Sequence, residues 1–288
     1  MNVITLIEQS AAQLEAAGVS YGHGTINAFD EAAWLVMWKL GLPLDDLDSV
    51  ENQPVAQEQI TQVATLLEAR ILTRKPAAYL TQEAWLQGVP FYVDERAIVP
   101  RSFIAELLVD GGIDYWLHEH SHAVLDLCTG NGSLAVLAAM VYPDVQITAS
   151  DLSTDALAVA RINVEKHSLQ ARITLVESDG LAQLDGPFDL ILCNPPYVNS
   201  QSMAALPAEY QAEPALALAG GTDGMDFIRS LLKAASSKMA PDAVLVLEIG
   251  NEREYFEAAF PALEVVWLET SAGEDQVLLV TREALDAL

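Results

Sequence analysis

Apolar residues in the first 72 positions recur at the spacing of amphipathic helices. The first such stripe is ended by Gly18 and consists of Ile4, Leu6, Ile7, Ala11, Leu14 and Ala17. A second helix is expected to begin after Asn27, whose side chain can cap it, and to stop at Gly41. A third passes through the apolar positions between Ile60 and Ile71. The pattern predicts an N-terminal helical domain over residues 1–75, which we expect to recognise the substrate.

The pattern changes over residues 76–101. Three short aromatic runs, 78–80, 84–86 and 91–93, are separated by Gly88 and Pro90. Such runs, broken by turn-forming residues, are typical of paired strands. The segment is therefore predicted to be a β-hairpin linker.

From residue 102 to 288, apolar strands alternate with helical patterns. The predicted strands are Ala123–Leu127, Gln146–Ser150, Arg172–Glu177, Phe188–Cys193, Ala243–Ile249, Leu263–Leu268 and Gln276–Thr281. Strands that alternate with helices form parallel sheets covered on both faces. The fold class is predicted to be α/β, with a mostly parallel sheet of seven strands over residues 102–288.

Charge narrows the choice of partner. The chain has 41 acidic and 14 basic residues, which gives a formal net charge of −27. Such a surface repels nucleic acid, whose binding depends on phosphate neutralisation, so no direct nucleic-acid binding is expected. It attracts a basic partner, although acidity that serves solubility alone explains the charge equally well.

Neither a membrane nor an oxidising compartment is indicated. The chain has no apolar run near the ~20 residues of a membrane span. Its first residues lack the basic start and the apolar core of a signal peptide. The two cysteines, Cys128 and Cys193, do not suggest a disulfide framework. A cytoplasmic location is predicted, and the oligomeric state is not readable from the sequence.

A glycine-bearing turn follows the first predicted strand of the sheet. Gly130 and Gly132 allow a tight turn and a close approach of backbone to ligand. Asp126, two residues before this turn, disfavours a phosphate by charge repulsion and can accept from an ammonium group or order the turn. Ala135 occupies the last glycine position of the pyrophosphate fingerprint. The turn therefore favours a cationic nucleoside without phosphate, such as S-adenosyl-L-methionine.

Two further acids end the next two strands. Asp151 is suited to bidentate bonding with ribose hydroxyls, and Asp179 is placed to meet an adenine amino group. The alternative is structural: Asp126 caps one helix, and Asp151 starts another through Ser153 and Thr154. The candidate cofactor-binding residues are Asp126, Cys128, Thr129, Gly130, Gly132, Asp151, Asp179 and Asn194.

The segment Asn194-Pro195-Pro196-Tyr197 follows the apolar run 188–193, so it is expected at the carboxyl end of a buried strand. Its prolines end the strand and stiffen the backbone. An amide acceptor, a stiffened carbonyl and an aromatic face suit the binding of a planar –NH2 group. A rigid turn with a surface tyrosine is the structural alternative.

These motifs together carry a family resemblance. Asp126, Gly130, Gly132, Asp151, Asp179 and Asn194-Pro195-Pro196-Tyr197 stand in an order that resembles class I S-adenosylmethionine-dependent methyltransferases with a Rossmann-like fold. Over nearly the whole chain, four segments resemble the protein-(glutamine-N5) methyltransferases: 21–25, 91–96, 99–102 and 209–214. Segments 21–24 and 126–130 are most similar to the branch that methylates large-subunit ribosomal protein L3.

The resemblance implies roles for the tetrapeptide. It implies that Asn194, Pro195 and Tyr197 are catalytic, and that Asn194, Pro195, Pro196 and Tyr197 bind the substrate glutamine. The implied partner is a basic ribosomal protein of the large subunit. Cys128, Gly180 and Phe103 depart from the release-factor enzymes, which often place Gly, Trp and Pro at these positions.

Three other functions are compatible with parts of the pattern. The same chemistry on the Gly-Gly-Gln loop of release factors is the nearest alternative. Methylation of an adenine amino group uses a similar tetrapeptide, but the charge of −27 disfavours it. A ribosome-assembly binding module with a vestigial cofactor fold is the non-enzymatic alternative.

Several remaining features are weaker. No metal is expected, since His118, His120 and His122 lie in a polar connector. Arg101 is a candidate partner for a cofactor carboxylate or for a surface acid. The loop 220–224 either flanks the mouth of the active site or is a plain turn. Trp34 and Trp38 are expected to belong to the core of a helix.

Overall fold

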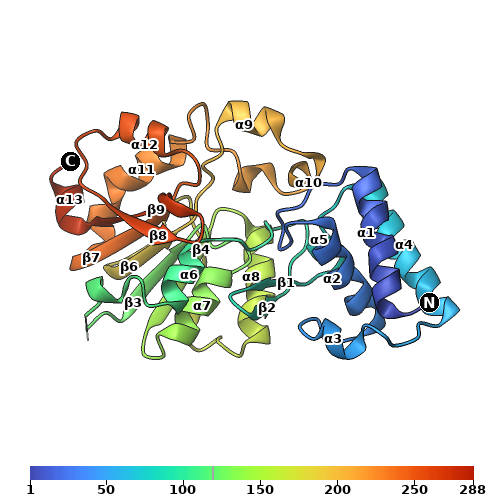
Figure 1. Ribbon diagram of the computed structural model, residues 1–288. Helices are drawn as coiled ribbons and strands as arrows, with labels where there is room; N and C mark the ends of the chain where they lie inside the picture. The colour runs from blue at the N-terminus through green and yellow to red at the C-terminus, as the bar shows by residue number, and fades with distance from the viewer. Residues whose placement is uncertain (119) are drawn as a thin grey trace.

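The computed structural model describes residues 1–118 and 120–288. Four helices form its N-terminal part: α1 (Val3–Ala17), α2 (Ala28–Leu40), α3 (Leu47–Val50) and α4 (Gln57–Thr73) (Figure 1). The side chain of Asn27 caps α2 as predicted, by accepting from the N–H of Asp30 at 2.9 Å. Gly18 and Gly41 end α1 and α2 in the left-handed conformation that glycine adopts without strain. The short α3 was not predicted, since one helical turn carries no periodic pattern.

The linker holds a smaller hairpin than predicted. Strands β1 (Ala84–Leu86) and β2 (Val89–Phe91) pair in antiparallel fashion. The run 78–80, predicted as part of the hairpin, instead lies in helix α5 (Ala77–Thr81), so that part of the prediction is wrong. Pro76 precedes this helix, and the buried side chain of Tyr79 donates from its hydroxyl to the carbonyl of Ala97 at 2.7 Å. An aromatic run therefore serves packing here, not strand pairing.

The seven-stranded sheet has the order β5-β4-β3-β6-β7-β9-β8, with β9 antiparallel to both of its neighbours. The prediction of a mostly parallel sheet is confirmed. Its strands are β3 (Ala123–Leu127), β4 (Gln146–Asp151), β5 (Ile173–Glu177), β6 (Phe188–Cys193), β7 (Met239–Glu248), β8 (Val266–Thr270) and β9 (Gly273–Thr281). Strand β8 begins at Val266 and not at Leu263 as predicted. Leu263 and Val265 pack against the core but do not pair with β9.

Helices cover both faces of the sheet (Figure 1). One face packs against α6 (Ile104–Val109), α7 (Ser133–Val141) and α8 (Thr154–Lys166), and the other against α11 (Asp226–Ala235), α12 (Arg253–Ala259) and α13 (Arg282–Asp286). Neighbouring residues along a strand enter opposite cores, as Val124 and Leu125 do. Both faces are therefore buried, as expected of a doubly wound sheet.

Short elements complete the chain. They are the helices α9 (Ser200–Ala205) and α10 (Ala208–Gln211) and the 3₁₀ segments Asp114–Trp116, Ala215–Ala217 and Ser236–Lys238. None of the helices in the described part of the chain combines the length and the apolar character that a membrane span needs.

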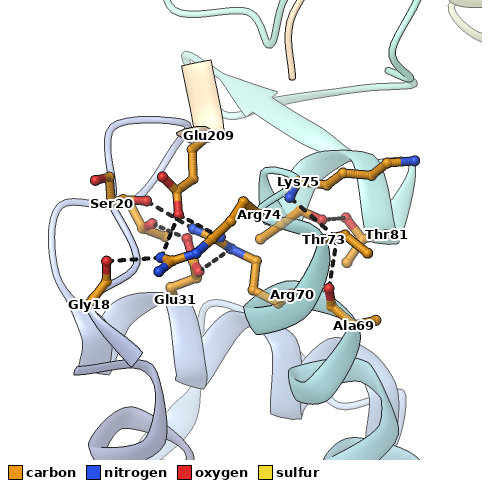
Figure 2. A network of polar contacts seen from close by, with 12 residues as sticks. Gly18, Ser20, Glu31, Ala69, Arg70, Thr73, Arg74, Lys75, Thr81 and Glu209 are labelled. Carbon is orange, nitrogen blue, oxygen red and sulfur yellow. Dashed lines mark hydrogen bonds and ion pairs between the residues drawn. The ribbon is translucent and has the colours of Figure 1, made fainter. Parts of the chain in front are cut away.

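A buried ion cluster joins α10 to the N-terminal helices (Figure 2). Arg70 of α4 is fully buried and donates to Glu31 at 2.8 Å and to Glu209 at 3.2 Å. It also donates to the carbonyl of Ser20 at 2.8 Å, and Arg74 donates to Glu209 at 3.1 Å. Glu209 begins a segment that continues into the pocket described next, so the cluster fixes that segment against the helical part.

Candidate active site

A pocket opens at the carboxyl ends of β3, β4 and β6, where α/β sheets bind their ligands. The space between its lining atoms, its open mouth included, is about 800 Å³, which is within the range of small-molecule sites. Six of the predicted site residues line it: Cys128, Gly130, Asp151, Asp179, Asn194 and Pro196. Five do not line it: Asp126, Thr129, Gly132, Pro195 and Tyr197. The structure thus brings acids from two segments, Asp151 and Asp179, together with the end of β6.

Asp126 is buried beneath the glycine-bearing turn. Its Oδ2 accepts from the Thr129 hydroxyl at 2.5 Å and from the N–H of Ala135 at 2.9 Å. Its Oδ1 is buried without a hydrogen-bond partner among the described residues. Burial raises the pKa of Asp126 to about 7. Asp126 therefore orders the turn through Thr129 and caps the start of α7 through Ala135, as the structural alternative held.

The turn itself uses three left-handed residues, with φ of 62° at Cys128, 55° at Gly130 and 82° at Gly132. A Cβ on Gly132 would lie 3.1 Å from the Cβ of Ala160, so only glycine fits against α8 without a shift. At Gly130 a Cβ would meet no protein atom within 4 Å. One glycine therefore permits helix packing, and the other leaves the backbone open to the pocket.

Asp151 holds the turn from the neighbouring strand. Its Oδ2 accepts from the N–H of Gly130 at 2.9 Å, and its Oδ1 accepts from the N–H of Ser153 at 2.9 Å. Burial raises its pKa, which its backbone hydrogen bonds lower in part. A carboxylate oxygen can accept more than one hydrogen bond, so both oxygens keep capacity for ligand hydroxyls. The structure therefore shows the structural role of Asp151 at the start of α8, and its place in the pocket is compatible with the predicted bonding to ribose hydroxyls.

Phe227 is a pocket residue that the sequence analysis missed. It lies on α11 and lines the pocket together with Asp179 and Gly180. A Cβ on Gly180 would lie 3.8 Å from the Phe227 ring, so the two are in contact. An aromatic face thus stands beside Gly180, where the sequence itself offers no aromatic side chain. No local pattern marks Phe227, because it lies 47 residues beyond Gly180, on another element.

The tetrapeptide stands at the end of β6, as predicted. Asn194 is half-buried, lines the pocket, and has no side-chain hydrogen bond to another described residue. Pro195 is buried and Pro196 lines the pocket. An amide that faces a pocket without a protein partner is free to bind a ligand.

Tyr197 is held on several sides. Its hydroxyl donates to Glu248 at 3.3 Å, and its ring lies so close to Gly250 that a Cβ there would come within 2.5 Å. The loop 220–224 packs against its backbone, since a Cβ on Gly224 would lie 2.2 Å from the Tyr197 carbonyl oxygen. The loop therefore packs against the tetrapeptide, although none of its residues lines the pocket.

Glu248 is a second residue that the sequence analysis missed. It ends β7 and accepts from the Ser102 hydroxyl at 2.6 Å and from the N–H of Phe103 at 3.0 Å, besides Tyr197. Burial raises its pKa to about 7. An acid in the otherwise apolar run 243–249 was the available signal. Glu248 links Tyr197 to the start of α6.

We expect Glu248→Gln to weaken the pH dependence of stability. Between the ordinary carboxyl pKa and about 7, the folded protein keeps a proton that the unfolded chain has lost, so stability falls as pH rises. Asp126, with a pKa of about 7, contributes in the same direction. The variant removes one of several such contributions, since the pKa values of Asp151 and Glu31 are also raised by burial, so the slope should become less steep without vanishing. Urea unfolding at pH 5 and pH 8 measures this slope, with the exposed substitution Glu254→Gln as the control. An equal slope in the two variants would contradict the raised pKa of Glu248.

Arg101 pairs with an acid, as one alternative held, but this acid is buried and does not lie on the surface. It makes two hydrogen bonds to the buried Glu213, at 2.7 Å and 2.6 Å. Glu213 also accepts from the N–H of Val99 at 2.9 Å and lies 3.3 Å from His23. Its pKa is lowered to about 2, because the bonds from His23 and Arg101 outweigh the opposing effect of burial. Arg101 therefore fixes the 209–217 segment, whose Pro214 lines the pocket.

The histidines show no metal site. Among the described residues, no cluster of three His, Cys, Asp or Glu side chains is arranged to hold a metal ion. Glu119, within the connector that carries the predicted histidines, lies outside the described residues.

Comparison with known proteins agrees with this geometry. Residues 109–217 match the methyltransferase small domain family. A ribosomal protein uL3 glutamine methyltransferase of Bordetella pertussis (strain Tohama I) is 51% identical over 284 residues, covering 98% of this chain and 95% of the relative. Another of that name, of Burkholderia pseudomallei (strain K96243), is 49% identical over 292 residues, covering 98% and 95%.

One solved structure supports the fold alone. The catalytic domain of hMettl16, in complex with the MAT2A 3′UTR hairpin 6, has a TM-score of 0.52 and 13% sequence identity, covering 77% of this chain and 80% of that chain. The predicted class I methyltransferase fold is confirmed.

Proposed function

The chain belongs to the family of ribosomal protein uL3 glutamine methyltransferases, and from this membership we propose that it methylates the side-chain amide nitrogen of a glutamine in uL3. One observation carries the proposal in the structure: Asn194, with its amide unbound, lines the same pocket as Asp151 and Asp179. A planar amide and a nucleoside can therefore meet at one place.

S-adenosyl-L-methionine is the cofactor that this pocket fits best. Among the lining residues, Asp151 suits its ribose, and Asp179 with Phe227 suits its adenine. Beneath the turn, Asp126 is proposed to accept from its ammonium group through the Oδ1 that lacks a hydrogen-bond partner among the described residues. Cys128, Thr129, Gly130 and Gly132 shape the turn beneath it. When bound, the cofactor supplies an electrophilic methyl group that needs no metal for activation.

Asn194 and Pro195 are proposed to prepare the nucleophile. The nitrogen of a glutamine amide is a weak nucleophile, since its lone pair is delocalised into the carbonyl. The side-chain oxygen of Asn194 and the carbonyl of Pro195 would accept its two hydrogens. These bonds orient the nitrogen and strengthen as it gains positive charge, so they stabilise the transition state more than the ground state.

Tyr197 and Pro196 are proposed to form walls of the site that holds the substrate amide. Stacking of the Tyr197 ring on the substrate amide stays a prediction. Its bond to Glu248 and its packing on Gly250 hold the ring before substrate arrives, which favours this role. A preorganised ring loses little freedom on binding.

The charge of the chain agrees with a basic protein substrate. A net charge of −27 speeds encounter with a basic ribosomal protein and opposes binding to RNA. We infer that the enzyme meets uL3 in the cytoplasm.

Competition between substrates tests the proposal. The protein is incubated with radiolabelled S-adenosylmethionine and equal amounts of purified uL3 and a release factor. We expect label on a glutamine amide of uL3. Label on the release factor alone, or on neither protein, would refute the proposal.

Cofactor affinity should fall in acid because of Asp126. With a pKa of about 7, this carboxyl must lose a proton before it can accept from an ammonium group. We expect the Kd to rise roughly tenfold from pH 7 to pH 5.5, where the cofactor amine stays protonated. Asp126→Asn should bind more weakly and lose most of this dependence. Titration calorimetry measures both, and an equal pH dependence in the two proteins would contradict the role of Asp126.

A further inference from the structure

A second hollow lies in the N-terminal part of the molecule. It is lined by residues of α2, of the loop that precedes α3, of β1 and of the segment 99–100. We call it the α2 groove and define it by Phe29, Trp34, Asp45, Trp85, Val99 and Pro100. The centre of a water molecule can reach a volume of about 710 Å³ in this groove, compared with about 130 Å³ in the cofactor pocket. The groove is large enough for several residues of a partner chain.

Large apolar side chains around the groove are unusually exposed. Ile26 is 86% exposed, Trp85 46% and Phe29 41%. Ile26 lies just before α2, Phe29 lies at its start and Trp85 lies in β1, and all three line one hollow. An apolar patch of this kind, rimmed by polar residues, marks a surface that binds a partner.

The rim of the groove selects for positive charge. Asp30 and Asp45 line the groove and are exposed. No lysine or arginine of the described residues lines it. The chain as a whole carries −27. A basic segment thus fits this surface, whereas the phosphates of a nucleic acid are repelled.

Trp34 offers a hydrogen bond to an occupant. Its ring lines the groove and packs on the core formed by Tyr79 and Val99. Its Nε1 is buried and has no acceptor among the described residues. An extended peptide presents free carbonyl oxygens, which supply such an acceptor.

The groove and the methyl-transfer site share a wall. Val99 and Pro100 line the groove, whereas the preceding residues 96–98 line the cofactor pocket. His23, another groove residue, contacts Glu213, and the adjoining Pro214 lines the cofactor pocket. A chain held in the groove therefore lies next to the site that receives the glutamine.

We propose that the α2 groove binds an extended, basic segment of uL3 close to the target glutamine. This inference rests on the proposed function and names the surface that selects the protein substrate. The exposed aromatic side chains bind apolar residues of that segment, the acids attract its basic residues, and Trp34 donates to its backbone.

Removal of the aromatic groups tests the groove directly. In Phe29→Ala/Trp85→Ala we expect the KM for uL3 to rise at least ~10-fold, with kcat and the cofactor Kd kept, because aromatic contacts dominate interface affinity. The matched control Tyr115→Ala/Tyr255→Ala removes two exposed tyrosines outside the groove, 87% and 44% exposed. If the wild-type protein methylates uL3 and the groove variant has an unchanged KM, this inference is overturned and the proposed function stands. Absence of wild-type activity on uL3 overturns the proposed function and the inference with it.

Charge reversal distinguishes a basic peptide from nucleic acid. Asp45→Lys should raise the KM for uL3 several-fold at low salt and less at high salt, whereas Asp242→Lys, an exposed site on β7, should not. Competition by a ribosomal RNA fragment at moderate salt, or a lower KM in Asp45→Lys, would overturn the inference.

Discussion

Asn194→Ala should lower the rate of methyl transfer by at least ~10²-fold, by analogy with the removal of one preorganised donor from an oxyanion hole. Its side chain lines the pocket without a protein partner, so the substitution breaks no bond within the described fold. The lost interaction is one that strengthens as the substrate nitrogen becomes positive. The loss should therefore appear in kcat under saturating uL3.

Cofactor affinity separates this role from a structural one. We expect the Kd of S-adenosylmethionine to stay within ~3-fold of wild type, since Asp126 and Asp151 hold the glycine-bearing turn without Asn194. Asn52→Ala, on the exposed surface of the N-terminal part, is the matched control and should change neither quantity. An equal fall in cofactor binding and in rate would contradict the division of roles.

Arg70→Ala should lower the free energy of unfolding by ~3–5 kcal/mol, the range found when one partner of a buried ion pair is removed. The guanidinium is fully buried and stands between Glu31 and Glu209 (Figure 2). Without it, two buried carboxylates keep only weaker partners, Thr25 for Glu31 and the half-exposed Arg74 for Glu209. The segment that carries Glu209 should loosen as well.

Urea unfolding measures this loss. The control is Arg253→Ala, which breaks an exposed pair with Glu257 on α12 and should cost no more than ~0.5 kcal/mol. Equal effects of the two substitutions would mean that the cluster around Arg70 does not hold the two parts of the molecule together. Arg70→Lys should recover part of the stability, since an ammonium group keeps the charge but lacks the fork of three nitrogens that reaches the three acceptors.

Much of the fold is readable because its signals are local. Asn27 and Gly41 bound α2 by the chemistry of a cap and of a left-handed turn, and both ends were predicted correctly. Strands β3 and β6 coincide with apolar runs, and each run is followed by turn-forming Gly or Pro residues. The run 78–80 was misjudged because packing of Tyr79 against the segment 93–99 overrides its strand propensity.

The site was predicted only where its residues follow strands. Asp151, Asp179 and Asn194 each come after an apolar run, which places them at one edge of the sheet. The partners of Tyr197 and of Arg101 were not predicted, because Glu248 and Glu213 lie 51 and 112 residues away in the chain. The aromatic Phe227 reaches the pocket from α11 without a local motif. Long-range pairing of this kind needs the folded chain.

Mass mapping of uL3 tests the central claim most directly. Ribosomal proteins are purified from cells that contain this protein and from matched cells that lack it, and the peptides of uL3 are compared. The account predicts one glutamine that is heavier by a single methyl group in the first sample and unmodified in the second. An identical modification state of every uL3 glutamine in the two samples would contradict it.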